Sequence, residues 1–583
     1  MPGNPQAVGP RAVGGHDPLG PCCETFHGHF DDYPMRSLLL ATLFFLGGAE
    51  PNTHAVVLDD YPRRIGIDVE NYRFELTLSD ETDVLVGRTT VSVRFTNNGV
   101  TELALDLTEV GDGGSGMTVH GVSSGGVGLV WVHEDDVLTI NLTEAGRAGL
   151  RRDVVIEYSG IPAAGLVPGP NAYGDRTFFS DNWPNRARNW LPTIDHPYDK
   201  SMNEMLVTAP AHYQVVSNGL LIEQTDRGDG TRMSHWKNSV PIATWLYVLG
   251  VAEFAVQQVD DFDGRAIQTW VYQQDRDAGF YDFAVPTKAA MEFYDEYVGP
   301  YAYEKLANIT SPVTGGGMEA ASAIMYHETS VTGERSVRWR NVIIHEVAHQ
   351  WFGNAVSASD WDDVWLSEGF ATYFTLLFIE HAYGRDEFVA GLRNSADRVF
   401  TQYENDPEYR IVHDDLADMG RVTSGATYQK GSWILHMLRN HMGDEAFWDG
   451  IRVYYAQYMN GNATTDDFRT VMEQASGLDL TLFFQQWLYS GGNPRLEGWW
   501  EYDSTARAIR IEINQTQSAG PTFELPLEIG VHFDGAALPA IVEQVAVDAR
   551  FHRFVIPVET EPTGVTLDPN VRLLFESNFR PRQ

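Results

Sequence analysis

Apolar and polar residues alternate along much of the chain between residues 72 and 254. Two clear examples run over residues 73–78 and 90–95, where an apolar side chain recurs at every second position between glycine-rich turns. Successive side chains of a strand point to opposite faces, so this period is typical of half-buried strands. We therefore predict an all-β domain over residues 55–258.

A helical period replaces this alternation in the middle of the chain, and alternation returns near the C-terminal end. Between residues 286 and 489, apolar residues recur at spacings of three and four, which is typical of amphipathic helices. After residues 491–494, which read Gly-Gly-Asn-Pro, strand-like segments follow over 508–513, 523–533 and 550–556. The pattern predicts an α+β multidomain fold, with a mainly helical domain over residues 259–490 and a β-sandwich domain over residues 491–583.

One predicted helix carries two histidines four residues apart, His345 and His349, with Glu346 directly after the first. Side chains at this spacing project from the same face of a helix, so the two imidazoles can bind one metal ion. Apolar residues flank the motif on both sides, and a buried helix has no structural reason to hold these polar groups without partners. Glu346 lies beside the metal and can take a proton from water, which is the task of a general base.

Glu368 begins the next predicted helix, whose apolar positions run from residue 370 to residue 379. Ser367 is its candidate N-cap, and Gly384 lies beyond its end. Two packed helices would bring Glu368 to the same metal as the histidines. Two imidazoles and one carboxylate leave a fourth coordination position open, as in catalytic zinc sites. The ligand types predict one Zn²⁺ per chain, although cobalt or manganese could bind the same set.

Three separated motifs resemble those of the M1 (gluzincin) family of zinc aminopeptidases. They are the zinc signature with its Glu368, the run Gly315-Gly316-Gly317-Met318-Glu319, which is similar to GxMEN, and Tyr428-Gln429-Lys430-Gly431, which is similar to YxKG. The resemblance implies a thermolysin-like catalytic domain and a substrate with a free N-terminus. It also implies that Glu319 binds the α-amino group, that residues 315–318 contact the substrate and that the Tyr428 hydroxyl donates to the oxyanion.

Two positions depart from the family pattern. Ala320 stands where the second motif usually ends in asparagine, which is expected to loosen the loop that carries Glu319. Trp183 stands where aminopeptidases often place a second amine-binding acid or amide, and Asp181 and Asn182 are the nearest polar candidates for that role. An endopeptidase or an epoxide hydrolase on the same scaffold therefore stays an alternative. A non-catalytic interaction module is a further alternative, disfavoured because every ligand and the base are present.

Composition narrows the classes of partner. The 583 residues carry a formal net charge of −39, and phosphate contacts need basic patches, so no nucleic-acid partner is expected. The two cysteines, Cys22 and Cys23, precede all the predicted domains. No disulfide is therefore expected within those domains.

Residues 35–50 have the pattern of a secretory signal. Met35-Arg36 supplies one positive charge, residues 38–46 are apolar, and residues 47–49 are small. This segment is too short to cross a bilayer comfortably, so no stable membrane span is expected. Signals begin at the N-terminus, so we expect Met35 to be the true start and residues 1–34 to be a disordered or mis-called extension. The protein is expected to be exported to the periplasm or the extracellular space.

Overall fold

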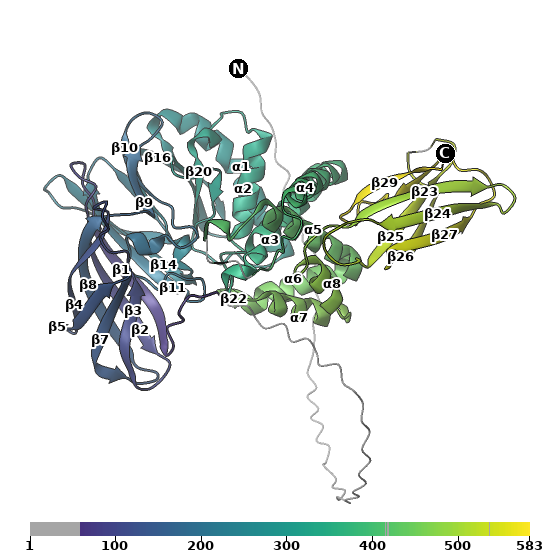
Figure 1. Cartoon of the computed structure of the whole chain (residues 1–583). Helices are drawn as coiled ribbons and strands as arrows, with labels where there is room; N and C mark the ends of the chain where they lie inside the picture. The colour runs from purple at the N-terminus through teal and green to yellow at the C-terminus, as the bar shows by residue number, and fades with distance from the viewer. Residues whose placement is uncertain (1–58, 414–415, 417–418, 536, 583) are drawn as a thin grey trace, which may run out of the picture. The chain divides into compact units, whose positions relative to one another are not determined.

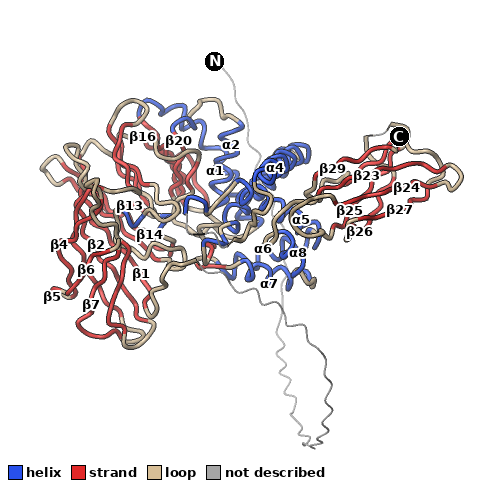
Figure 2. The backbone as a smooth tube through the Cα atoms, in the orientation of Figure 1, coloured by secondary structure: helices blue, strands red, loops and turns tan. Residues whose placement is uncertain are grey.

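The computed structural model describes residues 59–582, except 414–415, 417–418 and 536. The expected extension (1–34) and signal (35–50) lie outside the described residues. A β-rich region comes first along the chain, a mainly helical region follows, and a second β-rich region ends the chain (Figures 1 and 2). This order confirms the predicted fold class.

The first region is built on an eight-stranded sheet with the order β13-β14-β11-β1-β2-β8-β4-β5. Strand β2 buries every second residue from Leu85 to Phe95, as the alternation in the sequence predicts. Its neighbour β1 pairs antiparallel with β2 and parallel with β11. The strands are β1 (Ile67–Thr77), β2 (Leu85–Phe95), β4 (Gly116–Ser124), β5 (Val127–Gly128), β8 (Arg151–Ile161), β11 (Ser201–Pro210), β13 (Leu220–Asp226) and β14 (Thr231–Ile242).

Two smaller sheets complete this region. One has the order β3-β7-β6 and the other the order β12-β15-β10-β9. The segment between β10 and β11 is mostly buried and contains Trp183 and Asp195. The strands are β3 (Val100–Asp106), β6 (Val130–Glu134), β7 (Val137–Gly146), β9 (Leu166–Pro170), β10 (Arg176–Ser180), β12 (Gln214–Ser217) and β15 (Leu249–Ala252).

A five-stranded sheet, which the helical period did not predict, is formed by strands on either side of the first long helix. Its order is β16-β17-β18-β20-β19, formed by β16 (Phe254–Phe262), β17 (Arg265–Tyr272), β18 (Leu306–Ser311), β19 (Gly317–Met318) and β20 (Ala323–His327). Strand β18 pairs parallel with both of its neighbours, and all six of its residues are buried. A strand covered on both faces lacks the alternation that marks half-buried strands, which explains why the sequence pattern did not reveal it.

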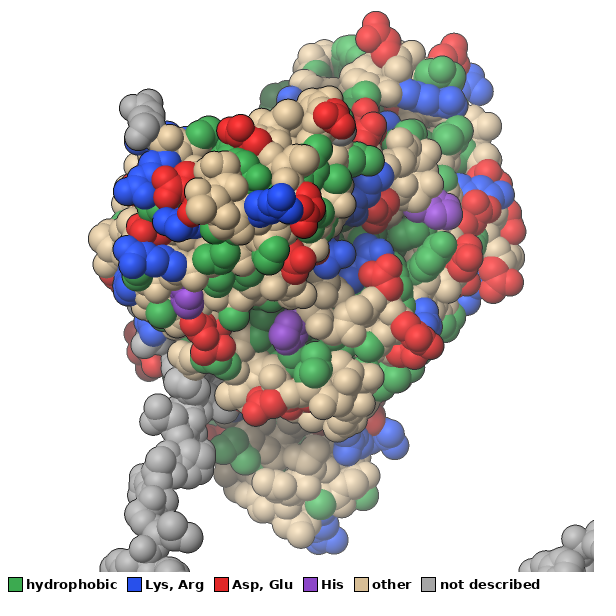
Figure 3. All heavy atoms as spheres, turned by 90° about the vertical axis from the view of Figure 1, so that its right-hand side faces the viewer, with side chains coloured by type: hydrophobic (Ala, Val, Ile, Leu, Met, Phe, Trp, Pro, Cys, Tyr) green, Lys and Arg blue, Asp and Glu red, His purple; other side chains and the backbone are tan. Residues whose placement is uncertain are grey.

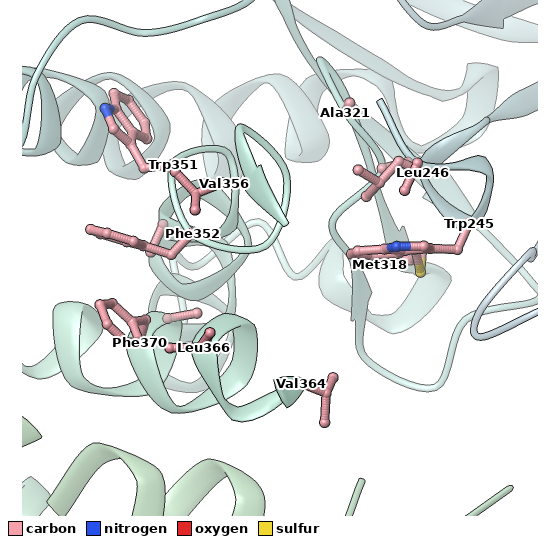
Figure 4. Close-up of a cluster of buried hydrophobic side chains, with 14 of the residues drawn as sticks. Trp245, Leu246, Met318, Ala321, Trp351, Phe352, Val356, Val364, Leu366 and Phe370 are labelled. Carbon is pink, nitrogen blue, oxygen red and sulfur yellow. The ribbon is translucent and has the colours of Figure 1, made fainter. Parts of the chain in front are cut away.

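Eight α-helices make up the described part of this region, and strands β18, β19 and β20 lie between the first and the second of them. The helices are α1 (Arg276–Tyr297), α2 (Val337–His349), α3 (Trp365–Tyr383), α4 (Arg385–Asn405), α5 (Gly425–Met442), α6 (Asp444–Tyr458), α7 (Thr465–Ser476) and α8 (Thr481–Trp487). Helices α3 and α5 approach closely at Gly369 and Gly431, where a Cβ on Gly431 would lie 2.9 Å from Gly369 Cα. Phe352, just after α2, faces Phe370 of α3 in the buried layer shown in Figure 4. Glycine and aromatic contacts thus bring α2, α3 and α5 together.

The last region contains a four-stranded sheet, β27-β24-β23-β29, and a three-stranded sheet, β26-β25-β28. Strand β24 buries Ile509, Ile511 and Ile513, and β25 buries a matching apolar set. Two sheets of this kind are what the predicted β-sandwich requires. Their strands are β23 (Arg495–Asp503), β24 (Ala508–Gln515), β25 (Leu525–His532), β26 (Ile541–Val547), β27 (Phe551–Pro557), β28 (Gly564–Leu567) and β29 (Glu576–Pro581).

The surface is mixed in character. On the face shown in Figure 3, acidic and basic side chains are interspersed with apolar and uncharged ones. Exposed arginines pair with carboxylates, as in the ion pair of Arg553 Nε with Glu512 Oε1 at 2.8 Å. Among the described residues, no helix combines the length and the apolar character that crossing a membrane requires.

Candidate active site

The structure brings the three predicted metal ligands together. His345 and His349 lie on the last turn of α2, and Glu368 lies on the first turn of α3. The two Nε2 atoms are 3.1 Å apart, and Glu368 Oε2 lies 3.5 Å from that of His345 and 3.2 Å from that of His349. Two nitrogens and one oxygen therefore point toward a common position.

The contacts of these residues fit a bound zinc ion. The Nδ1 atom of His349 lies 3.1 Å from the carbonyl oxygen of Phe352, and donation to that oxygen leaves Nε2 as the free ligand atom. Glu368 Oε2 is buried and has no hydrogen-bond partner among the residues that the structure describes. Burial lowers the pKa of His349, but the carboxylates of Glu319 and Glu368 together raise it to about 10. The position therefore strongly favours a positive charge, and its two-nitrogen, one-oxygen donor set suits Zn²⁺.

Ser367 supports a metal ligand and does not cap a helix, which corrects the sequence prediction. Helix α3 begins two residues earlier, at Trp365, with Val364 in the N-cap position. The Ser367 hydroxyl instead lies 3.1 Å from Nδ1 of His349. Gly353 makes room for this contact, because a Cβ there would overlap the Ser367 oxygen and its φ of +110° suits glycine. The predicted stop at Gly384 is confirmed, since α3 ends at Tyr383.

Glu346 is buried against the glycine run. A Cβ on Gly317 would overlap the Glu346 carboxyl group, so the glycine leaves the space that this side chain occupies. Burial raises the pKa of Glu346 well above its usual range, and the nearby charge of Glu319 raises it further. A carboxyl group with a raised pKa next to a metal position is suited to accepting and releasing a proton.

The glycine run also forms the edge of a sheet. Gly317 and Met318 make up β19, which pairs with β20 and is an edge strand of the five-stranded sheet in the described part of the chain. Such an edge can pair with an extended peptide. Gly315 and Gly317 line the cleft described below, whereas Gly316 does not, and the Gly316 carbonyl accepts the backbone N–H of His327 at 2.8 Å.

Glu319 follows β19 directly. Its side chain is buried, and Oε1 has no hydrogen-bond partner within the described part of the chain. Burial raises the pKa of Glu319 to about 7. An unpaired buried carboxylate is costly unless a cationic group meets it, so this position suits an ammonium group of a ligand.

Tyr428 lies in the first turn of α5, which Ser424 caps. Its hydroxyl donates to Glu368 Oε1 at 2.7 Å. Burial and the charge of Glu368 raise the pKa of Tyr428 well above its usual value, so the hydroxyl stays a donor. The rest of this motif serves packing, because Lys430 Nζ donates to the carbonyl of Gly492 at 3.0 Å and Gly431 contacts α3.

A cleft of about 340 Å³ joins these groups. Nine predicted site residues line this cleft: Gly315, Gly317, Met318, Glu319, His345, Glu346, His349, Glu368 and Tyr428. Four further residues line it as well, namely Asp181, Trp183, Arg186 and Thr314. Sequence reasoning missed Arg186 and Thr314. Arg186 lies three residues after Trp183, in the segment that resembles the family's amine-binding region. Its positive charge in that segment could have indicated a place in the cleft.

Of the two polar candidates beside Trp183, only Asp181 lines the cleft. Its Oδ2 pairs with Arg186 Nη1 at 3.0 Å. Asn182 is buried elsewhere, where it donates to the carbonyl of Tyr247 at 2.7 Å and accepts from the indole of Trp190 at 2.9 Å. Asn182 is therefore unavailable to a ligand in the cleft.

Known proteins share both the sequence and the fold of this chain. Residues 281–487 match the Peptidase family M1 domain, and residues 68–246 match the Peptidase M1 N-terminal domain. Human glutamyl aminopeptidase is 30% identical over 336 residues, which cover 54% of this chain and 34% of that protein. Probable aminopeptidase 2 of Sulfurisphaera tokodaii is 29% identical over 326 residues, which cover 53% of this chain and 40% of that protein.

A solved structure, an M1 zinc metallopeptidase from Deinococcus radiodurans, superposes with a TM-score of 0.63 at 25% identity. The match covers 73% of this chain and 93% of that one. The chain thus spans about a third of the length of the first curated relatives, but nearly all of this solved protein. Two family domains in the expected order and a shared fold agree with the geometry of the cleft. The chain belongs to peptidase family M1.

Proposed function

We propose that this chain is a zinc-dependent aminopeptidase that releases N-terminal residues from peptides. The observation that carries the proposal is the content of one cleft. It holds the convergent ligands His345, His349 and Glu368, the buried base Glu346, and a second buried carboxylate, Glu319, at the end of an edge strand. Two relatives, glutamyl aminopeptidase and probable aminopeptidase 2, support the same activity.

The metal ligands, Glu346 and Tyr428 have different roles in peptide-bond hydrolysis. Zinc bound by the three ligands supplies a Lewis acid that polarises a carbonyl and lowers the pKa of water. Glu346 accepts a proton from the attacking water and passes it to the leaving amine, a transfer for which its raised pKa is suited. Tyr428 offers a protonated hydroxyl beside the metal position, where negative charge develops on the carbonyl oxygen.

Substrate orientation follows from the sheet edge and the buried acid. The backbone of Gly317 and Met318 can pair with an extended peptide, and Glu319 then meets its α-ammonium group. Asp181 also lines the cleft, but its carboxylate is paired with Arg186, so Glu319 is the carboxylate that meets the ammonium group. The sheet edge and Glu319 together favour a free, charged N-terminus next to the scissile bond.

A panel of aminoacyl-fluorogenic substrates, each with a free and an N-acetylated amine, tests the proposal. Free-amine substrates should be cleaved much faster, and a chelator should abolish cleavage until zinc is restored. Similar rates for both forms, or cleavage of internal bonds, would indicate an endopeptidase. Hydrolysis of an epoxide without peptidase activity would indicate the second enzymatic alternative, and zinc-free protein without any activity would indicate an interaction module.

We also propose that the protein is exported. The support is the sequence of residues 35–50, with its positive charge, apolar core and small residues. Expression of the full chain in a bacterial host, followed by N-terminal sequencing of the fraction outside the cytoplasm, tests this. A mature N-terminus shortly after residue 49 is expected, whereas an uncleaved protein confined to the cytoplasm would contradict the proposal.

A further inference from the structure

Two buried amides hold the backbone of Glu319. The Nε2 atom of Gln350 donates to the carbonyl oxygen of Glu319 at 2.9 Å, and Nδ2 of Asn354 donates to the same oxygen at 2.6 Å. Both side chains are 0% exposed. One carbonyl oxygen can accept two hydrogen bonds, so both of its lone pairs are used here.

The residues that follow Glu319 are held in the same way. The carbonyl of Ala321 accepts from Asn218 Nδ2 at 2.7 Å, and that of Ser322 accepts from Lys305 Nζ at 3.1 Å. The backbone N–H of Ser322 donates to Oε1 of Gln350 at 2.9 Å. Figure 4 shows the apolar side of the same junction, where Trp245 and Leu246 lie against Met318 and Ala321. The loop is therefore fixed on several sides, although Ala320 was expected to loosen it.

The two amides lie directly after the helix that carries the two histidine ligands. Gln350 is the C-cap residue of α2, directly after His349. Asn354 is tied to the same turn, because its backbone N–H donates to the carbonyl of His349 at 3.1 Å. The position of Glu319 relative to the metal ligands is thus set by short bonds from one rigid segment.

We propose that Gln350 and Asn354 are positioning residues that fix Glu319 at a set distance from the metal ligands, so that the N-terminus of a substrate is held with its first peptide bond at the metal. This inference rests on the proposed aminopeptidase function. Neither amide needs to touch the substrate, because each acts through the backbone of Glu319. A carboxylate that shifts by about 1 Å no longer aligns the substrate, which is costly in rate.

Asn354→Leu tests the inference, with Asn238→Leu as its matched control. Both asparagines are 0% exposed, and each donates one 2.6 Å bond to a backbone carbonyl, of Glu319 for Asn354 and of Val240 for Asn238. Neither Oδ1 has a partner among the residues described. Each leucine therefore removes the same kind of bond, but only Asn354→Leu removes a bond that holds the Glu319 carbonyl. Zinc content and thermal midpoint are measured for both variants.

Rates are then measured with an aminoacyl-fluorogenic substrate and its N-acetylated form. In Asn354→Leu, kcat/KM for the free-amine substrate should fall about tenfold, mainly through KM, which is the upper range for one hydrogen bond. The rate with the acetylated form and the zinc content should stay unchanged. Asn238→Leu should keep the full preference for the free amine. A folded Asn354→Leu protein with the wild-type preference would overturn the inference.

A second variant keeps the test decisive if Asn354→Leu does not fold. Gln350→Glu retains an oxygen that accepts from the Ser322 N–H. It loses the 2.9 Å donor to the Glu319 carbonyl and a longer 3.4 Å contact with the Glu346 carbonyl, and it places an oxygen against both. It should also lose much of the free-amine preference, and a folded Gln350→Glu protein that keeps it would overturn the inference. A wild-type enzyme without any such preference refutes the proposed function itself, so the two failures are distinguishable.

Discussion

Replacing Gly317 with alanine should displace the proposed general base without touching the metal. An ideal Cβ at residue 317 would lie 2.2 Å from Oε1 of Glu346, whereas ordinary van der Waals contact begins at 3.4 Å. The carboxyl group must therefore move by about 1 Å, since the end of a side chain shifts more easily than the paired backbone of β19. Displacements of about 1 Å cost on the order of 100-fold in rate when they affect a reacting group.

We expect kcat of Gly317→Ala to fall about 100-fold, with KM, zinc content and thermal midpoint close to those of the wild type. The control is Gly316→Ala in the same glycine run, because a Cβ at residue 316 would meet no described atom within 4 Å and Gly316 does not line the cleft. That variant should keep nearly full activity. Steady-state kinetics on a free-amine substrate measures both. If Gly317→Ala retained kcat within threefold of the wild type, either the packing of Glu346 on Gly317 or its role as the base would be wrong.

Three further outcomes are expected. Glu346→Gln and Tyr428→Phe should lower kcat and kcat/KM together while zinc stays bound, and Tyr428→Phe should cost about 3 kcal/mol of transition-state stabilisation; near-normal turnover would return Tyr428 to a packing role. Removal of zinc should lower the thermal midpoint, because Oε2 of Glu368 then stays buried without a hydrogen-bond partner among the described residues; an unchanged midpoint would contradict zinc binding by these three ligands. Burial lowers the pKa of Lys200 to about 7 in the folded protein. Between about pH 7 and pH 10.5 the unfolded chain therefore keeps a proton that the folded chain has lost. The free energy of unfolding accordingly rises with pH over this range. In Lys200→Met, the increase in the free energy of unfolding between pH 7 and pH 9, measured by urea denaturation, should be smaller than in the wild type by roughly 2 kcal/mol. An unchanged increase would refute the lowered pKa of Lys200.

The sequence predicted the metal ligands because their geometry is local. Two histidines at i and i+4 share a helix face whatever surrounds them, and Glu368 needed only a second helix packed nearby. Ser367 was misassigned because the start of α3 depends on a turn over residues 361–363, where aspartates hide the helical period. Strand β18 escaped prediction because it is buried on both faces. The predicted domain boundaries and the catalytic roles stay predictions.

The positions of Arg186, Gln350 and Asn354 could not follow from local patterns. Arg186 reaches the cleft because the segment between β10 and β11 folds against the helical region, which no short-range signal encodes. Gln350 and Asn354 hold Glu319, which lies about thirty residues earlier in the chain. Such pairs become visible only when the buried donors and acceptors of the folded chain are matched with one another.

Each of the three motifs joins a group that carries chemistry to residues that make space or hold position for it. In the first, His345 and His349 are followed by Gln350 and Asn354, whose amides reach across to Glu319. In the second, Glu319 follows Gly317, whose missing side chain leaves room for Glu346 of the first motif. In the third, Tyr428 precedes Gly431, which allows the close approach of α5 to α3 and hence the hydrogen bond from Tyr428 to Glu368. The reactive group of one motif is therefore held in place by residues of another. Replacing a glycine or amide that has no chemical role of its own should then impair the reactive group of a different motif.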